Sequence, residues 1–361
     1  MSAGSAMTWP SIFTALLAGQ DLGTTESAWA MDQIMTGEAS PAQVAGFLMA
    51  LRAKGESVDE MRGLADTMLA HARRITVGGT TLDIVGTGGD RAHTVNISTM
   101  AALVAAASGV RVVKHGNRAA SSTSGSADVL EALGINLTLS PSEVAAVVEQ
   151  AGITFCFAQQ FHPSFRHAAV ARRDLGIGTA FNFLGPLTNP AQPTYAAVGV
   201  ADARMAPLMA GVFAGRGKDA AIFRGDDGLD ELTISTTSRV WWVRSGAVRQ
   251  YSVHPAQVGL ECHPLETLRG ADAAYNAQVV RDIFAGVVGP VRDAVVLNAG
   301  IALALTMPDL GESQVDFIAA LQTGMDRAGV AIDDGSATSV LQRWATATRA
   351  EVSGDVQTHK S

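Results

Sequence analysis

A short apolar segment that ends in three glycines constrains the fold of this chain more than any other feature. Residues 82–85 are apolar apart from one aspartate, and Gly86-Thr87-Gly88-Gly89 follows directly. An Ala- and Val-rich segment from about 96 to 108 then has the composition of a helix. Glycine permits positive φ and lets backbone N–H groups approach a ligand closely. The run predicts a buried strand, a tight turn and a helix, the unit from which α/β folds are built.

The same run carries the polar groups expected of a phosphate seat. Thr94, Asn96, Ser98 and Thr99 place hydroxyls and an amide at the start of the predicted helix, where free N–H groups and the helix dipole favour an anion. The run lacks the GxGxxG order of dinucleotide-binding folds, and no Gly-Lys-Ser/Thr follows as in nucleoside-triphosphate loops. Tight turns also use glycine for steric reasons alone. Other motifs must therefore decide whether a phosphate binds here.

The composition excludes several classes of protein. Of the 361 residues, 47% are hydrophobic and 17% charged, which allows a sizeable core in one large domain or two unequal ones. The net charge of −8 argues against a general nucleic-acid or anionic-membrane surface. Cys156 and Cys262 are too few for a disulfide framework or a thiolate metal site, so we expect reduced thiols and a cytoplasmic location. No signal peptide is recognisable, and the longest apolar stretch, 100–113, is too short to cross a bilayer.

Helical patterns occupy the first 75 residues. Capping boxes begin at Ser40 and Ser57, each ahead of an amphipathic run, and residues 9–17 suggest a further helix. Such short helices cannot bury their faces alone, so they pack on the rest of the chain or on a second subunit.

Strands and helices alternate from Leu82 onward, which predicts an α/β domain with a largely parallel sheet. Strands are expected at 82–85, 110–113, 153–158, 195–200 and 220–223, and intervening helices at 96–108, 126–133, 142–150, 162–174 and up to 214. Segments 232–235, 240–243 and 248–253 alternate like antiparallel ribbons, and late helices are expected at 273–285, 291–305, 315–328 and 337–349. The predicted units are a helical domain at 1–75, an α/β domain at 76–349 and a mobile polar tail at 350–361.

A second polar loop, Lys114-His115-Gly116-Asn117-Arg118-Ala119-Ala120-Ser121-Ser122, follows the next predicted strand. Lys114 can act as a point charge on a phosphate, and Arg118 offers a planar fork. Loops at the carboxyl ends of strands form the ligand crevice of open α/β sheets. Two such loops at successive strand ends favour the phosphate interpretation over an ordinary solvated loop.

Two further segments could complete a site. Gly225-Asp226-Asp227-Gly228-Leu229-Asp230-Glu231 holds four carboxylates, which is typical either of an acidic surface turn or of a site for a hard cation such as Mg²⁺. In the segment from Phe161 to Arg173, a helix would place Phe165 and Arg172 on one face. An arginine beside an aromatic ring can bind an aromatic carboxylate, but it can equally be a surface arginine lying over apolar groups.

Taken in order, these motifs resemble those of the anthranilate phosphoribosyltransferase family. The set comprises Gly-Thr-Gly-Gly-Asp, then Lys-His-Gly-Asn-Arg, then Phe181-Asn182-Phe183-Leu184-Gly185-Pro186-Leu187-Thr188-Asn189-Pro190, then Asp230-Glu231. The resemblance covers nearly the whole chain, to about residue 349. It implies an α/β fold with a small N-terminal all-helical domain, shared with class II nucleoside phosphorylases, and a cytoplasmic homodimer formed through the helical part with helices within 160–185. The implied reaction joins anthranilate to the phosphoribosyl group of 5-phosphoribosyl 1-diphosphate in tryptophan biosynthesis.

The resemblance also assigns site residues by position. For the phosphoribosyl donor these are Gly86, Gly89, Asp90, Thr94, Asn96, Ile97, Ser98, Thr99, Lys114, His115, Gly116, Asn117, Arg118, Ala119, Ala120, Ser121, Ser122 and Ser126. Catalysis is assigned to Lys114, His115 and Asn117. Two Mg²⁺ ions with bound diphosphate would be held by Ser98, Asp230 and Glu231. Anthranilate would be bound by Gly86, Asn117, Arg172 and His162. The sequence departs from the family pattern at Arg91, Gln159, Gln160, Phe165 and Gly178, mostly on the acceptor side.

Three alternatives remain at this point. Phosphoribosyl transfer to another aromatic acceptor would use the same donor residues. A nucleoside phosphorylase of related fold should lack the carboxylate pair and the Lys-His-Gly-Asn-Arg loop. A catalytically silent phosphate-binding regulator would have no need of Ser98, Asp230 and Glu231 as cation ligands.

Overall fold

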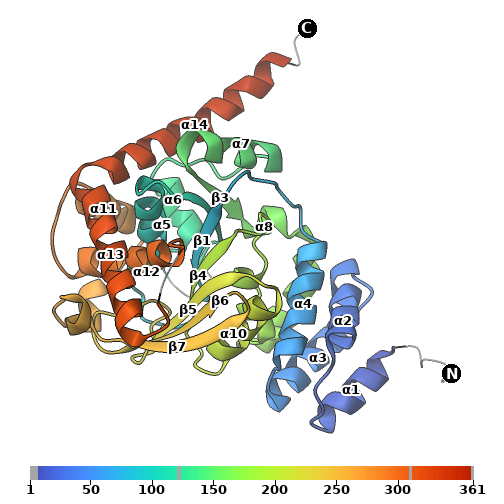
Figure 1. Ribbon diagram of the computed structural model, residues 1–361. Helices are drawn as coiled ribbons and strands as arrows, with labels where there is room; N and C mark the ends of the chain where they lie inside the picture. The colour runs from blue at the N-terminus through green and yellow to red at the C-terminus, as the bar shows by residue number, and fades with distance from the viewer. Residues whose placement is uncertain (1–6, 120–122, 309–310, 359–361) are drawn as a thin grey trace.

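The computed structural model describes residues 7–119, 123–308 and 311–358, with side chains described only as far as residue 350 (Figure 1). Four helices form the N-terminal bundle: α1 (Trp9–Leu17), α2 (Thr24–Thr36), α3 (Pro41–Lys54) and α4 (Val58–Ala70). The capping boxes at Ser40 and Ser57 begin α3 and α4 as predicted.

Helix α2 was not expected, because its buried face contains small residues. Ser27 and Ala30 are buried beside α4, where a Cβ on Gly63 would lie 2.1 Å from the Ser27 Oγ. Small side chains let α2 and α4 pack closely, but they also weaken the amphipathic pattern by which a helix is recognised.

A seven-stranded sheet forms the centre of the larger domain, in the order β3-β2-β1-β4-β5-β6-β7. The strands are β1 (Thr81–Gly86), β2 (Arg111–Gly116), β3 (Ile153–Phe157), β4 (Tyr195–Gly199), β5 (Asp219–Gly225), β6 (Ser238–Arg244) and β7 (Ala247–Val253). The first five are mutually parallel, and β6 and β7 are antiparallel, which confirms the predicted alternation. The expected strand at 232–235 is wrong: side chains, rather than a neighbouring strand, bond the backbone N–H groups of Leu232 and Thr233.

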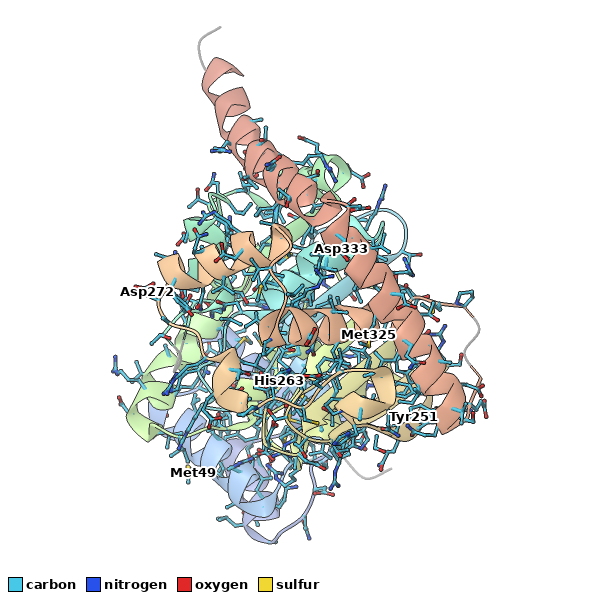
Figure 2. All side chains as sticks on the ribbon, turned by 90° about the vertical axis from the view of Figure 1, so that its left-hand side faces the viewer. Met49, Tyr251, His263, Asp272, Met325 and Asp333 are labelled. Carbon is cyan, nitrogen blue, oxygen red and sulfur yellow. The ribbon has the colours of Figure 1, made fainter. Side chains whose placement is uncertain are left out.

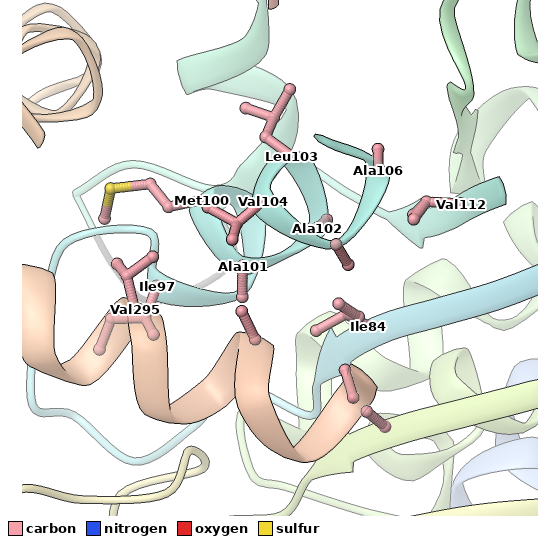
Figure 3. Close-up of a cluster of buried hydrophobic side chains, with 14 of the residues drawn as sticks. Ile84, Ile97, Met100, Ala101, Ala102, Leu103, Val104, Ala106, Val112 and Val295 are labelled. Carbon is pink, nitrogen blue, oxygen red and sulfur yellow. The ribbon is translucent and has the colours of Figure 1, made fainter. Parts of the chain in front are cut away.

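Two hydrophobic cores cover the two faces of the sheet. One contains α5 (Ile97–Ala107), α6 (Ser126–Ala132), α7 (Pro141–Ala151), α11 (Ala273–Phe284), α12 (Pro290–Leu305), α13 (Gln314–Asp333) and α14 (Ser336–Thr358). Figure 3 shows side chains of α5, β1 and α12, among them Ala101, Ile84 and Val295, converging in this core. The other core joins α10 (Met205–Gly215) and the N-terminal bundle to the opposite face. In Figure 2, Met49 on the bundle lies near the bottom of the molecule, and Asp333, where α13 ends, lies well above it.

The continuous helix expected at 162–174 is interrupted. The segment contains α8 (Ala158–Phe161), a 3₁₀ turn (Pro163–Ala168) and α9 (Ala169–Leu175). His162 precedes a proline and has φ −121° and ψ 60°, away from the helical region that a following proline disfavours. Two more 3₁₀ turns, Ala180–Phe183 and Gly185–Leu187, lead back to β4.

At the C-terminus, α14 continues to Thr358, beyond the helix end predicted at 349, and residues 359–361 lie outside the described residues. The mobility of the tail at 350–361 therefore stays a prediction. None of the described helices combines the length and apolar character needed to cross a membrane.

Candidate active site

A cavity of about 760 Å³ opens at the carboxyl ends of β1 and β2 and extends to the N-terminal bundle and α9. Strands β1 and β4 are neighbours, yet the chain continues from them toward opposite edges of the sheet. Such a topological switch point is where open α/β sheets bind ligands. Every site residue expected from sequence that the structure describes lines this cavity except Thr99, whose hydroxyl lies 3.2 Å from the Ser126 Oγ. Ala120, Ser121 and Ser122 lie outside the described residues.

The glycine turn after β1 bends through left-handed backbone. Gly88 and Gly89 have φ of 67° and 89°, and two non-glycine residues, Arg91 and His93, have φ of 60° and 52°. A side chain in this region costs about 1–2 kcal/mol. Arg91 occupies a position where the family usually has glycine, and its backbone keeps the conformation that glycine favours.

Helix α5 begins without a side-chain cap. Asn96 occupies the cap position, yet its side chain makes no hydrogen bond to the helix backbone. Instead its Nδ2 donates to the Ser124 carbonyl at 3.1 Å, and its Oδ1 accepts from the Asn276 Nδ2 at 2.9 Å. The N–H groups of Ile97 and Thr99 donate to the Val95 and Asn96 carbonyls at 2.7 and 3.1 Å, and that of Ser98 donates to Glu231. The start of α5 therefore favours an anion in the cavity through the positive end of its dipole rather than through free donors.

Lys114 lies at the end of β2, fully buried, with its ammonium directed under the glycine turn. Its Nζ donates to the Ile84 carbonyl and, at 3.3 Å, to the Ser98 Oγ. Burial lowers the pKa of Lys114, while the charges of Asp83, Glu231 and Asp230 raise it. Asp83 was not expected as part of the site because it sits inside an apolar strand; burial raises its pKa to about 6, against the opposing charge of Lys114.

Asp230 and Glu231 form a buried acidic pair beside Lys114. Burial raises the pKa of Asp230 to about 7, with Asp90 adding charge repulsion and a hydrogen bond. The pKa of Glu231 is also raised by burial and by Asp230, although the Ser98 N–H donates to it. Asp230 Oδ2 accepts from the Gly88 N–H at 2.6 Å, so the acidic pair is joined to the glycine turn.

This donor set fits a magnesium ion. Carboxylate and hydroxyl oxygens are the hard ligands that Mg²⁺ prefers, and a cation would relieve the repulsion among the carboxylates of Asp90, Asp230 and Glu231. In the part of the chain that the structure describes, no three His, Cys, Asp or Glu side chains form a complete metal cage. Mg²⁺ does not need one, because it commonly takes one or two carboxylates and completes its shell with substrate phosphates and water.

Two neutral histidines line the cavity next to this charged region. The rings of His115 and His162 are 5.2 Å apart, and the Gly185 carbonyl lies 2.9 Å from the His115 Nδ1. A carbonyl only accepts, so Nδ1 carries the proton and donates. Burial lowers the pKa of His115 to about 3 and that of His162 to about 4. Both rings are therefore uncharged near neutral pH.

The loop after β2 is braced by α6. Arg118 pairs with Asp128 at 2.9 Å and with Glu131 at 2.6 Å, and these hydrogen bonds raise its pKa. Its guanidinium is thus already paired, although the residue lines the cavity. Asp128 Oδ2 also accepts from the N–H groups of Ala119 and Gly125, so both residues are bonded to the start of α6. Asn117 lies within this loop and is exposed.

An arginine over an aromatic ring forms the far wall of the cavity. The Arg172 guanidinium lies 4.9 Å from the centre of the Phe165 ring, which in turn is 5.3 Å from Phe181. The contact predicted between Phe165 and Arg172 is confirmed, although the helix from which it was argued is interrupted. Burial lowers the pKa of Arg172, and none of the described carboxylates forms an ion pair with it. A ligand carboxylate would supply the missing partner.

The departures from the family pattern divide by position. Arg91, Gln159 and Phe165 line the cavity, whereas Gln160 donates to the Leu139 carbonyl and neither it nor the exposed Gly178 belongs to the wall. Sequence reasoning missed several wall residues that carry no charge pattern: Thr87, Gly88, His93, Ala158, Asn182 and Pro186. Of these, Thr87, Gly88, Asn182 and Pro186 lie inside the quoted motifs, whereas His93 and Ala158 were marked only by their proximity to them.

Comparison with known proteins agrees with this geometry. Residues 10–72 match the model of a glycosyl transferase family helical bundle domain, and residues 78–338 match that of its a/b domain. An anthranilate phosphoribosyltransferase of Nocardioides sp. is 60% identical over 94% of this chain and 99% of its own. One of Streptomyces griseus is 58% identical over 96% of this chain and 97% of its own.

Solved structures show the same relationship. The crystal structure of anthranilate phosphoribosyltransferase from Thermus thermophilus has 39% identity and a TM-score of 0.86, covering 94% of this chain and 99% of that one. The Saccharomyces cerevisiae enzyme in complex with PRPP and Mg has 27% identity and a TM-score of 0.85, covering 96% and 99%. This chain belongs to the anthranilate phosphoribosyltransferase family.

Proposed function

We propose that this protein transfers the phosphoribosyl group of 5-phosphoribosyl 1-diphosphate to the amine of anthranilate, giving N-(5-phosphoribosyl)anthranilate and diphosphate, in tryptophan biosynthesis. One observation carries the proposal: a single cavity joins the N-terminal end of α5, a buried lysine with two carboxylates, and an arginine without a carboxylate partner among the described residues. These are the groups needed for a phosphorylated donor, a cation with its leaving group, and an aromatic acid.

The donor would lie between the glycine turn and the loop after β2. The hydroxyls of Ser98 and Ser126, next to the positive end of the α5 dipole, would bind phosphate oxygens. Lys114 would neutralise part of the charge that develops on the departing diphosphate. Ser98, Asp230 and Glu231 would hold Mg²⁺, which supplies further charge neutralisation there when bound; we propose two ions. The yeast relative's complex with PRPP and Mg supports this arrangement.

The acceptor would lie at the Arg172 end of the cavity. The guanidinium would bind the anthranilate carboxylate while Phe165 and Phe181 provide an apolar wall for its ring. Gly86, Asn117 and His162 would contact the ring or amine. A yeast relative solved with 4-fluoroanthranilate supports an aromatic acid of this size.

In the reaction the amine nitrogen attacks C1 of the ribose with its lone pair. The bond between C1 and the diphosphate oxygen breaks, the electron pair leaves with diphosphate, and the amine then loses a proton. His115 is too weak a base to remove that proton in advance, because its pKa is about 3. The site therefore acts by orienting the amine and by stabilising the leaving group.

We further propose a cytoplasmic homodimer that forms through the helical domain. Leu17 of α1 and Ile177 after α9 support this, since both are exposed apolar side chains on that part of the molecule.

Product analysis by mass spectrometry tests the proposal against its alternatives. The protein is mixed with 5-phosphoribosyl 1-diphosphate, Mg²⁺ and either anthranilate or another aromatic acid, and separately with a nucleoside and phosphate. The proposal predicts phosphoribosylanthranilate as the main product. If another aromatic acid gives the main product, the protein is a phosphoribosyltransferase for a different acceptor. If the nucleoside is cleaved by phosphate, the protein is a nucleoside phosphorylase.

A further inference from the structure

The acidic pair has to be held in place without a strand. Asp230 and Glu231 lie in an irregular segment between β5 and β6, and no ladder of backbone hydrogen bonds fixes them. The next residue, Leu232, is bonded through both of its backbone groups to one side chain. Its N–H donates to the Asn298 Oδ1 at 2.8 Å, and its carbonyl accepts from the Asn298 Nδ2 at 2.9 Å. The side-chain amide thus takes the place of a neighbouring strand.

Asn298 is itself fixed. It is fully buried in the middle of α12, among apolar residues, and its Nδ2 also donates to the Ala294 carbonyl one turn earlier at 2.9 Å. A buried amide is costly unless its groups are bonded, and here the partners are the Leu232 backbone and the helix itself. The orientation of the Asn298 side chain therefore determines where Leu232 lies.

The opposite side of the acidic pair is bounded by strand ends. A Cβ on Gly199 would lie 1.6 Å from the Asp230 carbonyl oxygen, and one on Gly86 would lie 2.3 Å from the Asp230 Oδ2. These glycines are partners in the register of β1 and β4. The segment is consequently enclosed between two strand ends and the Asn298 amide.

We propose that Asn298 is a positioning residue that fixes the Asp230–Glu231 segment so that both carboxylates face the cation and diphosphate of the donor. The inference rests on the proposed function, because it names a residue that supports the cation site of that reaction. Asn298 does not line the cavity, and it acts through the backbone of Leu232.

The test compares Asn298→Leu with a matched buried change elsewhere. Leucine keeps the approximate size of asparagine but lacks both hydrogen-bonding groups. Thr348→Val removes a buried hydroxyl of α14 that accepts from the Asn136 N–H at 3.2 Å, remote from the acidic pair. Calorimetry measures the binding of 5-phosphoribosyl 1-diphosphate with Mg²⁺, electron paramagnetic resonance measures the binding of Mn²⁺ with the same donor, and kinetics give the KM for each substrate.

We expect Asn298→Leu to weaken Mg²⁺-dependent donor binding and Mn²⁺ binding by about 10- to 100-fold, the usual effect of losing a residue that orients metal ligands. The KM for anthranilate should change by less than about threefold, since Arg172 lies at the other end of the cavity. Thr348→Val should leave both binding constants unchanged. If Asn298→Leu does not fold, Asn298→Asp replaces it, because aspartate keeps the acceptor for the Leu232 N–H. We expect this variant to bind the donor and Mn²⁺ at least about tenfold more weakly.

Two results separate the possible failures. If the unaltered protein binds the donor and Mn²⁺ and the Asn298 variant binds them equally well while melting at a lower temperature, Asn298 is only a core residue and the inference is overturned. If the unaltered protein binds neither, the proposed function itself fails.

Discussion

The close approach of Gly199 to Asp230 gives the most quantitative prediction. In Gly199→Ala the new Cβ would lie 1.6 Å from the Asp230 carbonyl oxygen and 2.4 Å from its carbon, whereas ordinary contact begins at 3.4 Å. Both obstructing atoms are backbone, so no side-chain rotation can relieve the overlap. The Asp230–Glu231 segment, or the end of β4, must move by about 1.5–2 Å.

Such a displacement should reduce the reaction more than it reduces folding. A misplacement of about 1 Å in a catalytic group can cost about 100-fold. We expect kcat/KM for the phosphoribosyl donor to fall at least about 100-fold, which corresponds to about 2.7 kcal/mol of transition-state stabilisation. The Mg²⁺ concentration for half-maximal rate should rise in parallel.

The assay follows the loss of anthranilate fluorescence at a series of Mg²⁺ concentrations. Gly329→Ala in α13 is the control, because a Cβ there meets nothing within 4 Å. It should show unaltered kinetics. Full activity with an unchanged Mg²⁺ requirement in Gly199→Ala would refute the reasoning that the strand ends hold the acidic pair.

Three further predictions concern other parts of the site. Arg172→Ala should raise the KM for anthranilate by about 10-fold or more with little effect on that for the donor, because a charged hydrogen bond contributes about 1.5–3 kcal/mol; steady-state kinetics would contradict this if the donor constant rose more. In the unfolded chain His115 titrates near its usual pKa of about 6.5, but in the folded protein its pKa is about 3, so stability should fall as the pH drops below about 6.5, by at most about 1.4 kcal/mol per pH unit. Denaturant unfolding at a series of pH values should show that the free energy of unfolding depends less steeply on pH in His115→Asn than in the unaltered protein. An equal dependence on pH would show that the ring is not held neutral. Arg91→Gly should stabilise the fold by about 1 kcal/mol by relieving left-handed backbone, and a lower unfolding midpoint would exclude strain at that position.

Local sequence patterns were enough to predict much of the fold. Alternating apolar segments located all five parallel strands, and capping boxes marked the starts of α3 and α4, because these signals arise within a few neighbouring residues. Helix α2 escaped because its contact face depends on the small side chain of Ser27 and on the lack of a side chain at Gly63. The strand expected at 232–235 failed for a related reason: the partner of Leu232 is Asn298, a contact across 66 residues that no local pattern reveals.

The candidate site shows the same division. The charged and glycine-rich loops could be found because each is continuous in the sequence, and the sheet brings them to one edge. The residues that hold these loops in place could not be found in the same way. Asp83 lies in an apolar strand, Asn276 in an amphipathic helix and Asn298 in a buried helix. Each of these residues has its meaning only through the backbone or side chain that it meets after folding.

The central claim is that this cavity performs magnesium-dependent phosphoribosyl transfer to anthranilate. It is tested most directly by the loss of anthranilate fluorescence when the unaltered protein is mixed with anthranilate, 5-phosphoribosyl 1-diphosphate and Mg²⁺, with and without a chelator. We predict steady consumption of anthranilate that requires the donor and stops when the chelator is added. No consumption, or consumption that continues unchanged in the presence of the chelator, would contradict the account.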